Sequence, residues 1–367
     1  MAIRENTTLM REIIEKMEYM VRVMDADHKV IYMNKKMRDE FGHTMGHICY
    51  DLLDQCEKCE HCVTIGSKQS GKPDMKNVPI GDKFYNIMSS PVNAQDGTNY
   101  SIEFLHDITD QKKTEDELMK HYEKLKADIE FAKHIQKCTL PIDGVYYDAV
   151  ELNSVYQPSE DLGGDLFDMI KLDNRKSLIY ISDVSGHGIK SSLLTIFLRQ
   201  IVRGRTFESK PTLRRIVEVL LSSYLDLGIG DEQYLSVLFC CYDKENKEIS
   251  FLNAGHNCLP ILIHQNGEIE EIFVQGLPIC KLVEKPNHEQ VVVKVESGDR
   301  ILLYTDGITE TYNKAKVPYG TEGIIKTIKN NFGLDGKDLV RTILAEVQEY
   351  ADTTQIDDIA IVVAKIL

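Results

Sequence analysis

The chain has 367 residues, with 43 Lys and Arg against 58 Asp and Glu and a formal net charge of -15. This length suggests two domains and a connector, because a domain usually holds roughly 100–200 residues. The acidity argues against unspecific nucleic-acid binding, which needs clustered Lys and Arg. No apolar run approaches the ~20 residues of a membrane span, and Met1 to Glu15 lacks the apolar core of a signal peptide. We therefore expect a cytoplasmic protein that binds neither nucleic acid nor membranes.

Short mixed strands separated by polar turns are typical of residues 1–108. The expected strands are Met20–Asp25, Val30–Asn34, Phe84–Pro91 and Asn99–Asp107. The strand pair around Asp25–His28, together with the end Phe104–Gln111, resembles a PAS sensor domain that leads into its signalling helix. The resemblance implies that residues 1–108 form a sensor domain.

Cysteines are concentrated in one part of this first section, at Cys49, Cys56, Cys59 and Cys62. Thiolates two residues apart can close on one metal ion from a turn, as in zinc knuckles. The last three also have the spacing found in bacterial ferredoxins, so an iron–sulfur cluster is a second option. Reversible thiol oxidation and inert thiols are the alternatives. The spacing therefore predicts a second metal or redox site, with Zn²⁺ or an iron–sulfur cluster as its cofactor.

Residues 109–140 contain no Gly or Pro and are dense in Glu, Lys, Asp and Gln. Apolar side chains follow the alternating spacings of four and three of a coiled coil, at Leu118, Tyr122, Leu125, Ile129 and Ala132. The apolar positions then shift to Phe131, Ile135 and Cys138, a phase change that resembles a stutter. A lone helix this polar is marginal in water. We expect a coiled-coil linker helix that pairs in a parallel homodimer, and a single surface helix packed on one domain is the alternative.

Residues 141–367 combine strand pairs with amphipathic helices. The expected hairpins are Leu166–Ser182 and Leu235–Asn253, separated by the helices Ile189–Thr206 and Thr212–Leu227. Further strands are expected at Pro260–His264, Ile269–Val274, Gln290–Val295 and Arg300–Thr305, and two more helices (Thr321–Asn331 and Lys337–Tyr350) precede a last strand, Ile359–Lys365. Strands and helices segregate in groups and do not alternate singly. This pattern predicts an α+β domain with two antiparallel sheets and helices outside them.

Carboxylates stand at the ends of apolar strands in this third section, at Asp165, Asp183, Asp306 and Asp357. We expect Leu172 to face Ser177 across the turn of the first hairpin. Counting back from that pair sets Asp165 opposite Val184, with Asp183 at the same end of the ribbon. Converging carboxylates raise one another's pKa unless cations lie between them. Oxygen ligands suit Mg²⁺ and Mn²⁺, and two such ions can activate water and polarise a phosphoryl group.

Motifs in a fixed order surround these aspartates: Asp183–Gly188, Asn253–Asn257, Gly276–Ile279, Gly298–Glu310 and Asp357–Ile361, after the leading segment Ala132–Pro141. As an ordered set they resemble the metal-dependent type 2C (PPM) protein phosphatases, in their bacterial SpoIIE/RsbU-like branch. The resemblance implies an α-β-β-α sandwich and two Mn²⁺ or Mg²⁺ ions. One ion would be held by Asp165, Asp183 and the carbonyl of Val184. The other would be held by Asp183, Asp306 and Asp357, so that Asp183 is shared.

The same resemblance implies hydrolysis of phosphoserine or phosphothreonine by these aspartates, with a small anti-anti-sigma (STAS) protein as substrate. This chain has Ser185 where eukaryotic relatives carry a candidate acid His, so His187 is not assigned as general acid. We interpret His256 as a structural, hydrogen-bonded residue. A phosphatase fold without activity, used as a binding module, is the alternative. A remote alternative is a diguanylate cyclase, because Gly163–Phe167 differs from that family's signature only at Leu166, which replaces an acidic residue.

Overall fold

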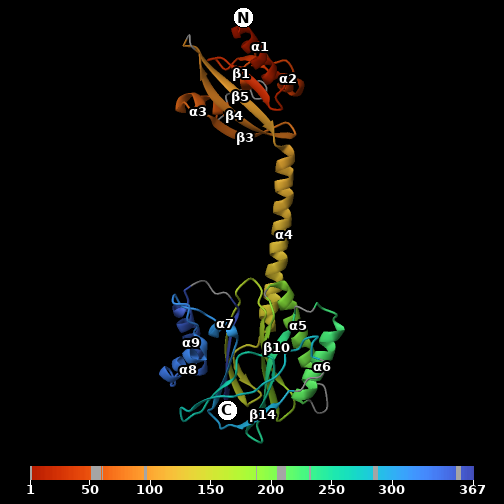
Figure 1. The fold of residues 1–367 in the computed structure, drawn as a ribbon, viewed down its shortest axis with the longest axis vertical. Helices are drawn as coiled ribbons and strands as arrows, with labels where there is room; N and C mark the ends of the chain where they lie inside the picture. Colours follow the sequence, from red (N-terminus) through yellow and green to blue (C-terminus); the bar gives the residue numbers. More distant parts are fainter. Residues whose placement is uncertain are drawn as a thin grey trace. The chain divides into compact units, whose positions relative to one another are not determined.

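Figure 1 shows the computed structural model, which describes residues 2–50, 59, 61–94, 97–186, 188–204, 212–230, 233–283, 288–352 and 357–367. The chain divides into two compact units, Met1–Leu125 and Lys126–Leu367. Helix α4 (Thr109–Thr139) contains the point of division, and its bounds lie within one residue of the expected helix. In the described segments no helix is both long enough and apolar enough to cross a membrane.

The first unit is built on an antiparallel sheet of five strands in the order β2-β1-β5-β4-β3. Its strands are β1 (Met20–Met24), β2 (Val30–Met33), β3 (Asp74–Ile80), β4 (Lys83–Asn93) and β5 (Asn99–Asp107), and its helices besides α4 are α1 (Ala2–Glu15), α2 (Lys35–Phe41) and α3 (Val63–Ser70). Met24, Met33 and Leu105 lie in its small core. The strands expected from the sequence are present, whereas β3 and the short helices were not expected.

The second unit contains two antiparallel sheets, in the orders β14-β11-β10-β9-β8 and β13-β12-β15-β16-β7-β6. We call them the β8 sheet and the β16 sheet. The strands are β6 (Gly144–Tyr146), β7 (Val150–Gln157), β8 (Asp165–Lys171), β9 (Lys176–Val184), β10 (Leu235–Asp243), β11 (Glu248–Ala254), β12 (Ile261–Ile263), β13 (Ile269–Glu271), β14 (Gln290–Lys294), β15 (Arg300–Tyr304) and β16 (Ile359–Ile366). The helices are α5 (Ile189–Gly204), α6 (Leu213–Asp226), α7 (Asp306–Thr309), α8 (Gly320–Asn330) and α9 (Gly336–Tyr350).

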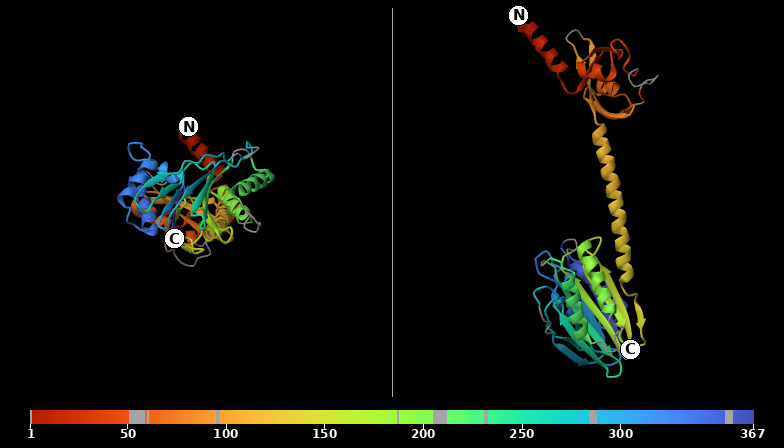
Figure 2. Two further views of the ribbon diagram at one scale, coloured as in Figure 1. Left: turned by 90° about the horizontal axis from the view of Figure 1, so that it is seen from below. Right: turned by 90° about the vertical axis from the view of Figure 1, so that its right-hand side faces the viewer.

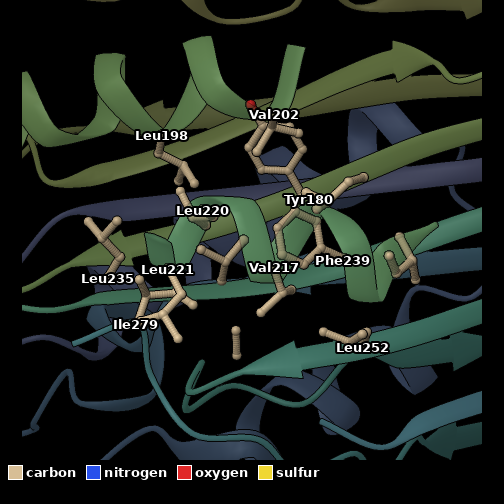
Figure 3. Packing of buried hydrophobic residues seen from close by; sticks show 14 of the residues in the cluster. Tyr180, Leu198, Val202, Val217, Leu220, Leu221, Leu235, Phe239, Leu252 and Ile279 are labelled. Carbon is tan, nitrogen blue, oxygen red and sulfur yellow. The ribbon is translucent and has the colours of Figure 1, made fainter. Parts of the chain in front are cut away.

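Helices cover the outer face of each sheet, as the two further views of the unit also show (Figure 2). On the β8 sheet, Leu198 of α5 and Leu220 of α6 pack among side chains that include Tyr180 and Phe239 (Figure 3). A second core lies between the two sheets, and a third joins α8 and α9 to the β16 sheet. Strands such as β10 are therefore buried on both faces, which explains why they appear in the sequence as unbroken apolar runs. The layer order is the α-β-β-α sandwich expected for residues 141–367.

The register of the first hairpin differs by one residue from the one we expected. Lys171, and not Leu172, pairs with Ser177, because the Leu172 amide is already bonded to the Lys176 carbonyl inside the turn. Asp165 is consequently opposite Asp183 and not opposite Val184. Directly opposed residues of neighbouring strands project to the same face of the sheet. The observed register therefore places the carboxylates of Asp165 and Asp183 closer together than the expected register does.

Candidate active site

The aspartates predicted from the sequence come from both sheets of the second unit. Asp165 is the first residue of β8, and Asp183 lies near the end of β9. A single residue separates the end of β15 from Asp306, which begins α7, and Asp357 lies two residues before β16. Since β15 and β16 pair antiparallel from Tyr304 opposite Ile361, the end of one strand meets the beginning of the other. The fold thus gathers all four positions at one end of the sandwich.

Asp165 is the most deeply buried of these carboxylates, with 2% of the residue exposed. Burial raises its pKa well above the ordinary value, and the charges of Asp183 and Asp358 raise it further. Thr305 donates a side-chain hydrogen bond that acts in the opposite direction. The Oδ2 atom of Asp165 is buried and has no hydrogen-bond partner. A buried, unpartnered carboxylate oxygen is costly unless a cation or a proton compensates it.

Asp183 lies within a field of negative charge. Burial, followed by the charges of Asp306, Asp357 and further acidic groups, raises its pKa to about 7. Burial also raises the pKa of Asp306 and of Glu310, and for Glu310 the neighbouring aspartates add to the effect. Several carboxylates that raise one another's pKa are typical of a site that gathers cations.

The donor chemistry of this end fits hard divalent ions, since every candidate ligand is an oxygen. A divalent ion would also compensate the buried Oδ2 of Asp165, which has no hydrogen-bond partner. However, within the parts of the chain that the structure describes, no three Asp, Glu, His or Cys side chains are already grouped at a spacing that would hold one ion. An ion bound here would be held by one or two of these carboxylates, with waters or a backbone carbonyl completing its ligands.

Two residues that sequence reasoning did not assign hold the Gly163–Asp165 turn in place. Asp358 accepts hydrogen bonds from the Gly164 amide and from the amide and hydroxyl of Ser159, at 2.7 and 3.0 Å for the latter two. Gln136, at the end of α4, donates to the Gly163 carbonyl at 2.7 Å and accepts from the Gly163 amide at 3.2 Å. The turn has no room for side chains, because a Cβ on Gly164 would lie 2.7 Å from the Val184 carbonyl oxygen. The sequence offered one signal for Gln136, which lies in the segment Ala132–Pro141 that precedes the ordered motifs.

His256 is buried and holds several elements together beside the aspartates. Its Nε2 lies 3.0 Å from the Tyr304 carbonyl and its Nδ1 lies 3.3 Å from the Ser236 hydroxyl. Burial lowers its pKa to about 4, so the ring is neutral, with Nε2 donating and Nδ1 accepting. This agrees with the structural interpretation of His256. His187 lies outside the described residues.

The cysteine segment lies in the first unit, and Cys56 lies outside the described residues. Cys49 is buried, and Cys59 and Cys62 are partly buried. The Cys49 carbonyl accepts a hydrogen bond from Arg22, which forms a buried ion pair of 2.7 Å with Glu103. Burial raises the pKa of the Cys49 thiol to about 11. Among the described cysteines the arrangement is not that of an assembled metal site, and the metal or redox site stays a prediction.

Several known proteins are similar in sequence to part of this chain. Phosphoserine phosphatase RsbP of Bacillus subtilis (strain 168) is 28% identical over 190 residues, which cover 50% of this chain and 46% of RsbP. Phosphoserine phosphatase RsbU of the same organism is 20% identical over 246 residues, covering 66% of this chain and 71% of RsbU. Protein IcfG of Synechocystis is matched over 41% of its length, so the chain spans less than half of two of these relatives.

Two solved structures share the fold. The SiaA-PP2C domain of Pseudomonas aeruginosa superposes with a TM-score of 0.56 at 17% identity, over 67% of this chain and 98% of that one. The PP2C phosphatase domain of SpoIIE from Bacillus subtilis, with a fragment of its regulatory domain, gives 0.52 at 16% identity, over 80% and 82%. The second unit therefore has a PP2C-type fold.

The family model described as stage II sporulation protein E (SpoIIE) matches residues 173–367, more than half of the chain. This match leaves nothing in favour of the diguanylate cyclase alternative. It begins after Asp165 but contains the other predicted aspartates in their expected order. The chain belongs to the SpoIIE family.

Proposed function

We propose that this protein is a metal-dependent protein serine/threonine phosphatase. The observation that carries the proposal is the pairing of Asp165 with Asp183 across β8 and β9, where a buried Oδ2 without a hydrogen-bond partner lies among carboxylates from both sheets. Family membership supports the same conclusion, as do two relatives that are named phosphoserine phosphatases.

The proposed ligands of two Mn²⁺ or Mg²⁺ ions are the side chains of Asp165, Asp183, Asp306 and Asp357 and the carbonyl oxygen of Val184. Such ions, when bound, supply an activated water and positive charge for the phosphoryl oxygens. The chain's own part is to hold the carboxylates. Asp358 and Gln136 fix the turn that carries Asp165, and the Asn257 side chain hydrogen-bonds Asp306. We assign no general acid.

The proposed substrate is a phosphorylated anti-anti-sigma protein of the STAS class. Support comes from the names RsbP and RsbU among the relatives and from the SpoIIE family match. A partner-switching pathway, in which dephosphorylation of the STAS protein releases a sigma factor, is therefore the proposed setting.

We further propose the division into a PAS-like sensor (1–108), a coiled-coil linker (109–140) and a phosphatase domain (141–367). The five-stranded antiparallel sheet of the first unit is compatible with the sensor assignment. Leu118, Tyr122 and Leu125 of α4 are each more than half exposed, which favours pairing with the same helix of a second copy. Gln136 then offers a route by which movement of the linker reaches the turn that carries Asp165. The cysteine segment is the proposed place where the sensor binds a metal ion or responds to oxidation.

The test is hydrolysis of p-nitrophenyl phosphate and of a phosphoserine peptide by the full chain, with Mn²⁺ and with EDTA. We expect phosphate release that requires Mn²⁺ and is lost in Asp183→Ala and in Asp306→Ala, while circular dichroism shows that both variants are folded. Exposed Asp352 provides a matched control, and Asp352→Ala should hydrolyse both substrates at the unmutated rate. Full activity in both site variants would refute the site, and a chain that binds Mn²⁺ without hydrolysis would favour the binding-module alternative.

A further inference from the structure

A pocket of about 630 Å³ lies beside the candidate active site. Its lining includes Asn257 in the loop after β11, Phe273 and Leu277 in the segment after β13, and Glu289 just before β14. We call it the Asn257 pocket. Of these four residues, Asn257 alone has been given a role so far, as the hydrogen-bond partner of Asp306.

The loop that forms one wall of this pocket crosses between the two sheets at the aspartate end. It leaves the β8 sheet at Ala254, which pairs with Val237, and enters the β16 sheet at Ile261, which pairs with Leu302. Within the loop, the side chain of Asn257 hydrogen-bonds Asp306. The pocket and the acidic cluster are therefore adjacent, with Asn257 shared by both.

The pocket is already formed by well-braced backbone. The segment from Phe273 to Leu277 is pressed against the loop, because a Cβ on Gly276 would lie 1.6 Å from the Asn253 carbonyl oxygen. Asn253 in turn donates to the carbonyls of His256 and Val274, at 2.9 and 3.1 Å. Preformed hollows with a few polar groups are the usual form of binding sites.

The rim of the pocket carries apolar side chains that a folded protein normally covers. Phe273 is 67% exposed and Leu277 is 53% exposed. Glu289 adds an exposed carboxylate to the same rim. An apolar rim with one acidic group suits an apolar side chain next to a basic one.

We propose that the Asn257 pocket binds the residues of the substrate polypeptide that flank its phosphoserine. The proposal rests on the proposed function and adds the recognised sequence: an apolar side chain against Phe273 and Leu277, and a basic side chain near Glu289. An extended peptide advances ~3.3–3.6 Å per residue, so neighbours of a phosphoserine held at the aspartates reach past Asn257 into the pocket. A small phosphate ester has no such neighbours and does not use the pocket.

The experiment compares kcat/KM of the Mn²⁺-loaded full chain for p-nitrophenyl phosphate and for two phosphoserine peptides. One peptide has Leu and Lys beside the phosphoserine, and the other has Ala at those positions. We expect the Leu/Lys peptide to be preferred, and the double variant Phe273→Ser/Leu277→Ser to lower the ratio of its kcat/KM to that of p-nitrophenyl phosphate by about tenfold. Glu289→Lys should remove the preference for Lys. Because these side chains are exposed, the substitutions leave the core intact.

Val145→Ser is the matched control, since Val145 is 61% exposed on β6, the edge strand of the β16 sheet farthest from β12 and β13. It should leave the ratio unchanged. An equal fall on both substrates in the double variant, or no fall on either, would overturn the proposal. If the unmutated chain hydrolyses nothing, the proposed function fails. Fluorescence anisotropy of the labelled Leu/Lys peptide then still tests whether the Asn257 pocket binds the peptide. Binding that is lost in the double variant supports it, and equal or absent binding overturns it.

Discussion

The contact of Gln136 with Gly163 gives the sharpest prediction about how α4 supports the active site. The side chain of Gln136 is buried, and it satisfies both the amide and the carbonyl of Gly163. In Gln136→Ala both backbone groups lose their partner inside a buried turn. Each such group costs about 1–3 kcal/mol, and water that enters the vacated space recovers part of that. We expect a loss of about 2–4 kcal/mol in the unfolding free energy of the second unit.

The same change should weaken metal binding, because Gly163 is two residues from Asp165. Urea denaturation followed by circular dichroism measures the stability of the full chain, and isothermal titration with Mn²⁺ measures the affinity. We expect Mn²⁺ to bind more weakly in Gln136→Ala by about tenfold, the equivalent of 1.4 kcal/mol. Gln111→Ala is the control, because Gln111 is an exposed glutamine on the same helix. Unchanged stability and affinity in Gln136→Ala would refute the reasoning.

A second variant separates the hydrogen bonds from simple filling of space. Gln136→Glu keeps the shape of the side chain, but an ionised carboxylate cannot donate to the Gly163 carbonyl and repels it. A protonated carboxyl group can donate. The stability deficit of Gln136→Glu relative to the unmutated chain should therefore shrink as the pH falls, whereas the deficit of Gln136→Ala should not. Parallel pH profiles for the two variants would show that the hydrogen bonds are not what holds the turn.

Three further predictions test other parts of the chain. Asp168 is fully buried and holds two arginines of α5 at 2.6 and 3.2 Å, so Asp168→Ala should cost about 3–5 kcal/mol of stability by urea denaturation, and Asp168→Asn less. Leu125→Glu should shift the full chain from dimer to monomer in analytical ultracentrifugation, and an unshifted dimer would place the contact elsewhere. Because the pKa of Cys49 is raised to about 11, only about one thiol in a thousand is ionised at pH 8, so iodoacetamide should modify it far more slowly than exposed Cys138, at a rate that rises with pH. Peptide mass spectrometry follows both cysteines, and equal rates would contradict this.

The central strands β8, β10 and β16 of the second unit could be predicted from the sequence because helices and a second sheet bury both of their faces. The expected strand Ile359–Lys365 differs from β16 by one residue for this reason. By contrast, β6 and β7 were not expected. Nor was β3, which has no buried residue and contains Pro79, so its sequence lacks the apolar signal. The register of the first hairpin was wrong by one residue because the turn is closed by the Leu172 amide, a choice of turn geometry that the residues alone did not fix.

The positions of the candidate ligands could be predicted, but the residues that hold them could not. The bonds from Gln136 and Asp358 to the glycine turn join positions 27 and 194 apart in the chain. No local pattern reports contacts of that kind. The ordered motifs indicated which segments matter, and the fold was needed to show which atoms meet.

Asp357 and Asp358 stand side by side before β16, and the sequence analysis assigned only Asp357 as an ion ligand. Successive side chains near a strand point to opposite sides, so the two carboxylates cannot share one role. Asp358 is buried and accepts hydrogen bonds from the Ser159 and Gly164 amides. Asp357 is exposed, and its charge raises the pKa of Asp183. Asp358→Asn turns an amide donor toward one of those amides and should cost about 1–3 kcal/mol of stability with or without metal. Asp357→Asn removes a repulsive charge, so it should not lower the metal-free stability, and it should remove the stabilisation that Mn²⁺ gives in thermal unfolding. The opposite pattern would exchange the two roles.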